Sequence, residues 1–182
     1  MTIVPALADA DIAAATFAAH LERALASGPA VRSGWTATIV SPLEAVIHLT
    51  ARRPDGTTDL YHLRLRAQWY DQFPPQAEFV APPRDPDPSW RSPSTESRWM
   101  PRINNGVFPD GRFAFHPVYT FGTEQRQLIC CSMSFDYYVS GHGPTEAQKW
   151  RQGRHTLVAL LTRVQEALLP PAYEGPAGDH DS

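Results

Sequence analysis

The sequence predicts one α+β domain, in which a helix precedes an antiparallel sheet and a second helix follows it. Apolar residues recur at helical spacing in two segments, one near each end of the chain. Between these segments, short stretches alternate apolar and polar residues and are separated by turn residues, as in antiparallel strands. A chain of 182 residues with 42% hydrophobic content is long enough to bury one core and short for two domains. Helices packed on one antiparallel sheet are therefore expected.

The first helix is predicted over residues 9–27. Its expected buried face consists of Ile12, Phe17, Leu21 and Leu25. Asp9 or Asp11 can cap the first turn, because a short acidic side chain accepts hydrogen bonds from the first backbone amides. Gly28 and Pro29 end the helix.

Four strands are predicted to follow as an antiparallel meander. They cover residues 35–40, 45–51, 61–67 and 77–80. The turn at Pro54, Asp55 and Gly56 joins the second strand to the third. In the third strand Tyr61, Leu63, Leu65 and Ala67 alternate with His62, Arg64 and Arg66. One face of the sheet is therefore expected to be core and the other to face solvent.

Residues 82–115 are expected to be irregular, because much of the chain's proline lies between residues 74 and 101. Trp90 and Trp99 lie in this segment, and two interpretations of them stay open. Exposed tryptophans often anchor protein partners, whereas tryptophans in a covering loop pack on a sheet.

The last helix is predicted over residues 145–169. Its apolar positions are Leu157, Leu160, Leu161, Val164 and Leu168, which share one helical face. Pro170 and Pro171 end it. The domain is expected to cover residues 1–171, and residues 172–182 are expected to lack fixed structure because they are rich in Gly, Pro and Asp.

Composition excludes several classes of function. The formal charge is -3 and the basic residues are scattered, so nucleic acid is not an expected partner. No stretch approaches the ~20 apolar residues of a membrane span, and the start of the chain is acidic rather than basic, so a cytoplasmic protein is expected. The only two cysteines, Cys130 and Cys131, are neighbours, which disfavours a disulfide and predicts reduced thiols.

Three short motifs occur in a characteristic order. They are Tyr70-x-x-Phe73-Pro74-Pro75-x-x-x-Phe79, then His116-Pro117, then Leu128-Ile129-Cys130. With the predicted elements around them, they resemble the ubiquitin-conjugating (UBC) family over most of the chain. The likeness departs from the family at Val118, where an asparagine is usual, and at Cys131, where leucine is common.

The resemblance implies a UBC-like fold with an N-terminal helix, a four-stranded meander, a long loop holding the active-site cysteine, and a C-terminal helix. It implies an acyltransferase that accepts a ubiquitin-like protein from an activating-enzyme-like protein as a cysteine thioester and passes it to an amine of a protein substrate. A bacterial conjugation operon, including one of antiviral defence, is the implied setting, with no cofactor and no metal. The alternative is a catalytically inactive UBC-like or RWD-like binding module, which the missing asparagine favours.

Cys130 and Cys131 are the predicted centre of any chemistry, since a thiolate accepts an acyl group and also leaves readily. The motif match favours Cys130 as the nucleophile, and Cys131 would point to the opposite face if the segment is extended. The competing interpretation is that both are small core residues, because cysteine is among the most buried residue types.

His142 is the candidate to replace the missing asparagine, either as a hydrogen-bond donor to an oxyanion or as a base for the attacking amine. The family resemblance gives His116 an architectural role. A zinc site formed by His116, Cys130, Cys131 and His142 has suitable ligand types but lacks a C-x-x-C or H-x-x-x-H spacing. The aromatic residues Phe135, Tyr137, Tyr138 and Trp150 are expected to pack in the core, with a channel for an extended peptide as the alternative. Asp136 is read as a surface acid or as a carboxylate near an incoming amine.

Overall fold

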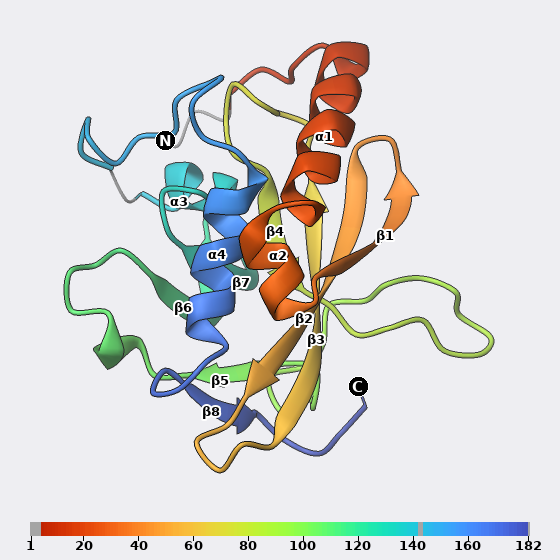
Figure 1. The fold of residues 1–182 in the computed structure, drawn as a ribbon, viewed down its shortest axis with the longest axis vertical. Coiled ribbons are helices and arrows are strands. Elements are labelled where there is room, and N and C mark those ends of the chain that lie inside the picture. The colour runs from red at the N-terminus through yellow and green to blue at the C-terminus, as the bar shows by residue number, and fades with distance from the viewer. Residues whose placement is uncertain (1–4, 142–143, 182) are drawn as a thin grey trace.

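The computed structural model describes residues 5–141 and 144–181, and it has the α+β architecture that the sequence predicts (Figure 1). A four-stranded antiparallel sheet has the order β1 (Thr36–Ser41), β2 (Glu44–Arg52), β3 (Thr58–Arg66), β4 (Gln76–Phe79). Its inner face packs against the helices α1 (Ala10–Leu25), α2 (Gly28–Ser33) and α4 (Leu157–Ala167). Among the described residues, no helix has both the length and the apolar character that crossing a bilayer requires.

Helix α1 begins at Asp9, whose carboxylate accepts hydrogen bonds from the amides of Asp11 and Ile12 at 3.1 Å each. Its buried residues are Ala13, Phe17, Leu21 and Ala24. The expectation for Ile12 is wrong, because this side chain is 67% exposed. Phe17 and Leu21 are buried as expected, and the alanines Ala13 and Ala24 replace Ile12 and Leu25 at the two ends of the buried stripe.

The outer face of the sheet is not the open solvent face that was expected. His62 and Arg64 are only 6% and 8% exposed. The proline-rich segment after β4 crosses this face, and the rings of Trp90 and Trp99 lie 5.0 Å and 5.2 Å from the His62 ring. His48 on β2 completes the cluster, since its Nδ1 lies 2.8 Å from Nδ1 of His62. In this structure the two tryptophans therefore cover the sheet.

The chain between the meander and α4 contains more regular structure than expected. Its elements are β5 (Pro101–Ile103), the 3-10 turn η1 (Asn105–Val107), β6 (Ala114–Phe121), β7 (Glu124–Cys130) and α3 (Phe135–Val139). Strands β6 and β7 form a separate antiparallel hairpin. The cysteine segment therefore ends a strand and does not lie in a long loop.

Helix α4 is shorter than predicted. It begins at Leu157, whereas residues 145–156 form turns. Gly153 has φ +72°, a left-handed conformation that no helix interior accommodates. Trp150 instead anchors this segment, because its indole N–H donates to the Asp71 carbonyl at 2.7 Å.

Residues 172–181 are not a tail without fixed structure. Strand β8 (Tyr173–Pro176) pairs with β5. The hydroxyl of Tyr173 donates to Oδ2 of Asp59 at 2.7 Å and lies 2.7 Å from the hydroxyl of Tyr61. The buried side chain of Tyr173 thus holds this segment against β3, although the Gly- and Pro-rich composition predicted no fixed structure.

The His62 cluster predicts a loss of stability in acid. Burial, reinforced by the charge of His48, lowers the pKa of His62 to about 4. The unfolded protein therefore binds an extra proton below about pH 6.5, so stability is present above that pH and is lost as pH falls toward about 4. We expect the free energy of unfolding of wild type minus that of His62→Gln to shrink by about 1 to 3 kcal/mol between about pH 7 and pH 4.5, measured by denaturant titration. For the control variant His180→Gln, whose side chain is exposed, the difference in free energy of unfolding from wild type should stay constant over this range of pH. An equal pH dependence of the two differences would contradict the assignment to His62.

Candidate functional site

A single buried glutamine fixes the hairpin that carries the cysteines. The side-chain oxygen of Gln127 accepts from the Phe79 amide at 3.0 Å, and its side-chain nitrogen donates to the Phe79 carbonyl at 2.9 Å. The rings of Phe79 and Phe115 add an edge-to-face contact at 5.3 Å. The side chain of Gln127 therefore joins β7 to β4 through the pair of hydrogen bonds that the backbone of a neighbouring strand would otherwise make.

The two cysteines lie in different environments. Cys130 is half-buried at the end of β7, where it pairs with Ala114, whereas Cys131 is 2% exposed and belongs to the core. A tight turn follows the strand, because the Ser134 amide donates to the Cys131 carbonyl at 2.9 Å. The expected burial of one thiol is confirmed, and the choice of Cys130 as nucleophile stays a prediction.

Burial also sets the ionisation of both thiols. It raises the pKa of Cys130, and it raises the pKa of Cys131 to about 12, with a smaller opposing effect from backbone amides. A thiol in an apolar environment loses the solvation that stabilises its thiolate. Neither cysteine is a preformed thiolate at neutral pH, and Cys131 is unsuited to nucleophilic chemistry.

Several polar side chains surround the end of β7 on the face of Cys130. The register places His116 on this face of the hairpin, and its ring lies 5.7 Å from the ring of Tyr119. The Tyr119 hydroxyl donates to the Ser140 carbonyl at 2.9 Å, and the Ser140 hydroxyl donates to the Tyr137 carbonyl at 3.0 Å. Burial raises the pKa of Tyr137, with smaller contributions from Cys130 and Cys131.

The predicted partner His142 lies outside the described residues. Its described neighbour Ser140 contacts Tyr119, as above, so the chain returns to the His116 side of the hairpin just before it. Val118 lies in the irregular stretch between His116 and Tyr119, and its apolar side chain is 49% exposed. Its side chain supplies no hydrogen-bond donor.

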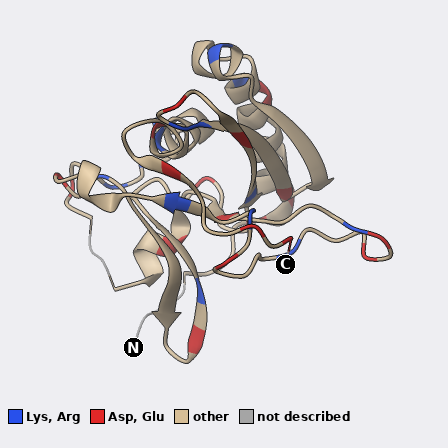
Figure 2. Cartoon of the chain, turned by 90° about the horizontal axis from the view of Figure 1, so that it is seen from below, with Lys and Arg blue, Asp and Glu red and all other residues tan. Residues whose placement is uncertain are grey.

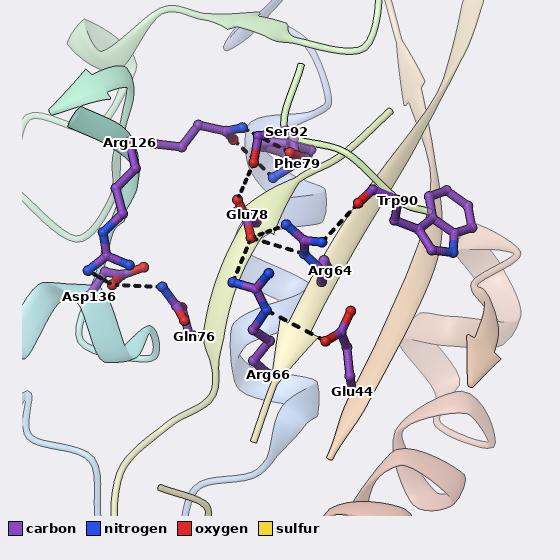
Figure 3. A network of polar contacts seen from close by, with 11 residues as sticks. Glu44, Arg64, Arg66, Gln76, Glu78, Phe79, Trp90, Ser92, Arg126 and Asp136 are labelled. Atoms are coloured by element: carbon purple, nitrogen blue, oxygen red, sulfur yellow. Dashed lines mark hydrogen bonds and ion pairs between the residues drawn. The ribbon is translucent and has the colours of Figure 1, made fainter. Parts of the chain in front are cut away.

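Asp136 is a buried acid, so the interpretation of it as a surface acid is wrong. Its carboxylate is 1% exposed, lies 3.0 Å from Nη2 of Arg126 and accepts from the side-chain amide of Gln76 at 3.4 Å. Figure 3 shows these three side chains meeting between β4, β7 and α3. Burial raises the pKa of Asp136 to about 6, and the charge of Arg126 opposes that shift.

A second set of charges lies on the outer face of the sheet. Glu78 accepts from Arg64 at 2.6 Å, lies 3.1 Å from Nη1 of Arg66 and accepts from the Ser92 hydroxyl at 3.0 Å (Figure 3). Arg64 also donates to the Trp90 carbonyl at 3.1 Å. These contacts hold the tryptophan segment on the sheet and give the network an architectural role.

Most of the aromatic cluster packs in the core, as expected. Phe135 stacks on Trp69 with ring centroids 4.0 Å apart, and the Tyr138 hydroxyl donates to the Ser132 carbonyl at 2.9 Å. Tyr137 differs, because it lines a cavity beside the cysteines. Within residues 5–141 and 144–181, no three His, Cys, Asp or Glu side chains are placed to hold a metal ion.

The sequence analysis missed Gln127 and the position of Tyr137. Gln127 directly precedes the apolar residues Leu128 and Ile129, and a polar residue adjoining a buried strand is a signal for a hydrogen bond inside the protein. Tyr137 gave no such signal, because it stands among other aromatic residues.

Comparisons with protein-family models, with curated proteins and with solved structures give no match. The chemistry of the site is therefore argued from its own geometry.

The burial of the thiols predicts their reactivity. Iodoacetamide should label Cys130 alone in the folded protein, because Cys131 is enclosed in the core. The rate should increase steeply above about pH 8.5, since the raised pKa keeps the reactive thiolate scarce at lower pH. Mass spectrometry should find no adduct in folded Cys130→Ala and both adducts in unfolded wild type. Labelling of Cys131 before Cys130 would contradict the assignment.

Asp136 predicts a pH dependence opposite in sign to that of His62. Its raised pKa means that the folded protein retains a proton that the unfolded protein releases, so stability present below about pH 4 is lost as pH rises through about 6. The free energy of unfolding of wild type minus that of Asp136→Asn should fall by about 1 to 3 kcal/mol from about pH 4 to pH 7. Glu124→Gln, an exposed acid on the same hairpin, is the control and should show no such trend.

Proposed function

We propose that this protein is a ubiquitin-conjugating-like acyltransferase that carries the C terminus of a ubiquitin-like protein on Cys130. The single observation that supports this most is the separation of the adjacent thiols. Cys131 is enclosed in the core, whereas Cys130 is half-exposed at the end of a strand beside His116 and Tyr137. A transfer enzyme needs one accessible thiol on a rigid element, and Cys130 meets that requirement.

The proposed reaction has two exchanges at one carbonyl carbon. Cys130 loses its thiol proton and its sulfur attacks the thioester on an activating-enzyme-like protein. That protein's thiolate leaves with the electron pair of the broken C–S bond and takes up a proton in turn. An amine of a protein substrate then attacks the new thioester, forms the amide bond, loses a proton and expels the thiolate of Cys130. No redox step and no cofactor enters this reaction.

The second candidate is a UBC-like or RWD-like binding module without catalysis. The raised pKa of Cys130 and the apolar Val118 favour it, because the described residues supply neither an activated thiolate nor the family's asparagine. The two candidates differ in one measurable property, which is whether a thioester forms.

The test is thioester formation with ATP, an activating-enzyme-like protein and a ubiquitin-like protein, both sought among the genes that adjoin the one for this chain. We expect a conjugate on wild type that disappears on treatment with a thiol reductant, and we expect Cys130→Ala to abolish it. Cys131→Ala is the matched control and should retain the conjugate if the protein folds. Because removal of a core thiol leaves a small cavity, its free energy of unfolding should fall by about 1 kcal/mol, measured in parallel.

The outcomes separate the candidates. Loss of the conjugate only in Cys131→Ala would move the nucleophile to the buried thiol and contradict the site. Absence of any conjugate with the folded wild-type protein, while the activating enzyme itself becomes charged, would favour the binding module.

A further inference from the structure

A cavity of about 590 Å³ lies beside the cysteine turn, within the range of small-molecule sites. Its walls come from α4, from the turns before α4, from residues 131–133 and from the turn at Arg112. Cys131 and Tyr137 are among the lining residues. The cavity is thus a distinct space on the α4 side of the cysteine turn.

Positive charge gathers in this cavity. Arg112, Arg154 and Arg163 line it. Arg112 pairs with Asp110, which lies outside the lining, and Arg163 pairs at 2.8 Å with Glu166, the one acid that lines the cavity. Arg154 makes no ion pair within the part of the chain that the structure describes. The chain as a whole is acidic, at -3, and its charges are interspersed (Figure 2). Arg154 is therefore the lining guanidinium whose charge no described carboxylate offsets.

The start of α4 adds to the positive potential. Thr156 and Val158, on either side of the first helical residue, line the cavity. No side chain caps this helix end, and its first turn contains no acid. The amides at a helix start carry a partial positive charge that a ligand's anionic group can satisfy.

One part of the wall is apolar. Met133, Val158 and Ala159 present carbon and sulfur surface there, and Arg163 lines the same cavity. A ligand that matched the cavity would combine an acidic group with a flat apolar body.

We propose that this cavity binds a small organic anion, with its carboxylate or phosphate held by Arg154 beside the start of α4 and its apolar body against Met133 and Val158. The bidentate geometry of arginine suits both acidic groups. The cavity shares Tyr137 with the proposed thioester site, but neither Cys130 nor His116 lines it, and the inference does not depend on the thioester.

The test uses three naphthalene probes of similar size in calorimetric titrations of the full chain at low salt. They are 2-naphthyl phosphate, 2-naphthoate and the uncharged 2-naphthamide. We expect one site per chain, with each anion binding at least about 10-fold more tightly than the amide, since a charged hydrogen bond contributes about 1.5 to 3 kcal/mol. Raising the salt concentration should weaken only the anions.

Two variants locate the site and one serves as control. Arg154→Gln should weaken binding of the anions about 10-fold and leave the amide unchanged. Ala159→Phe should weaken all three probes by filling the apolar part. Arg32→Gln, an exposed arginine on α2, should change nothing. Thermal unfolding of each variant verifies folding, and Arg154→Gln is the decisive variant because its side chain is exposed.

Three results would overturn the proposal. They are equal affinity for the amide and the anions, unchanged affinity in folded Arg154→Gln, and no measurable heat with any probe at millimolar concentration. Selective binding of the phosphate over the carboxylate would support the site and identify its acidic group.

Discussion

The position of the candidate site depends on the paired hydrogen bonds between the side chain of Gln127 and the backbone of Phe79. Strand β4 ends the four-stranded sheet, and the β6–β7 hairpin forms a separate sheet, so no backbone ladder joins them. A buried amide or carbonyl without a partner costs about 1 to 3 kcal/mol, and Gln127 removes that cost for both groups of Phe79. Because this side chain sets where β7 lies, it also sets where Cys130 lies, three residues later.

The same side of the molecule contains two buried titratable groups with opposite effects. Burial lowers the pKa of His62 to about 4 and raises that of Asp136 to about 6. One group makes folding less favourable in acid and the other makes it less favourable toward neutral pH, so their effects offset each other between about pH 4 and 6. The net change in stability over that interval is therefore expected to be smaller than either group alone would produce.

The sequence predicted the elements that local periodicity determines. The four meander strands and the start of α1 at Asp9 follow from alternation and capping, and both agree with the structure. Periodicity carries no information about contacts between residues that are distant in the sequence. The predictions that were wrong depended on such contacts. Trp90 and Trp99 cover His62 across a long loop, and Tyr173 reaches Asp59 over more than half the chain. For the thiols, strand alternation anticipated that one is buried, whereas the depth of burial that raises their pKa required the fold.

That raised pKa bears directly on how a thiol at Cys130 would behave in acyl transfer. A thiol of higher pKa forms less thiolate at neutral pH, but the thiolate that forms is intrinsically more nucleophilic. It is also a poorer leaving group, so an acyl group would pass from a thiol of lower pKa to Cys130 and be released slowly to water. Burial thus disfavours spontaneous reaction of Cys130 and favours retention of an acyl group once it is attached. An amine held beside His116 and Tyr137 would then react because of its proximity, without requiring an unusually reactive thioester.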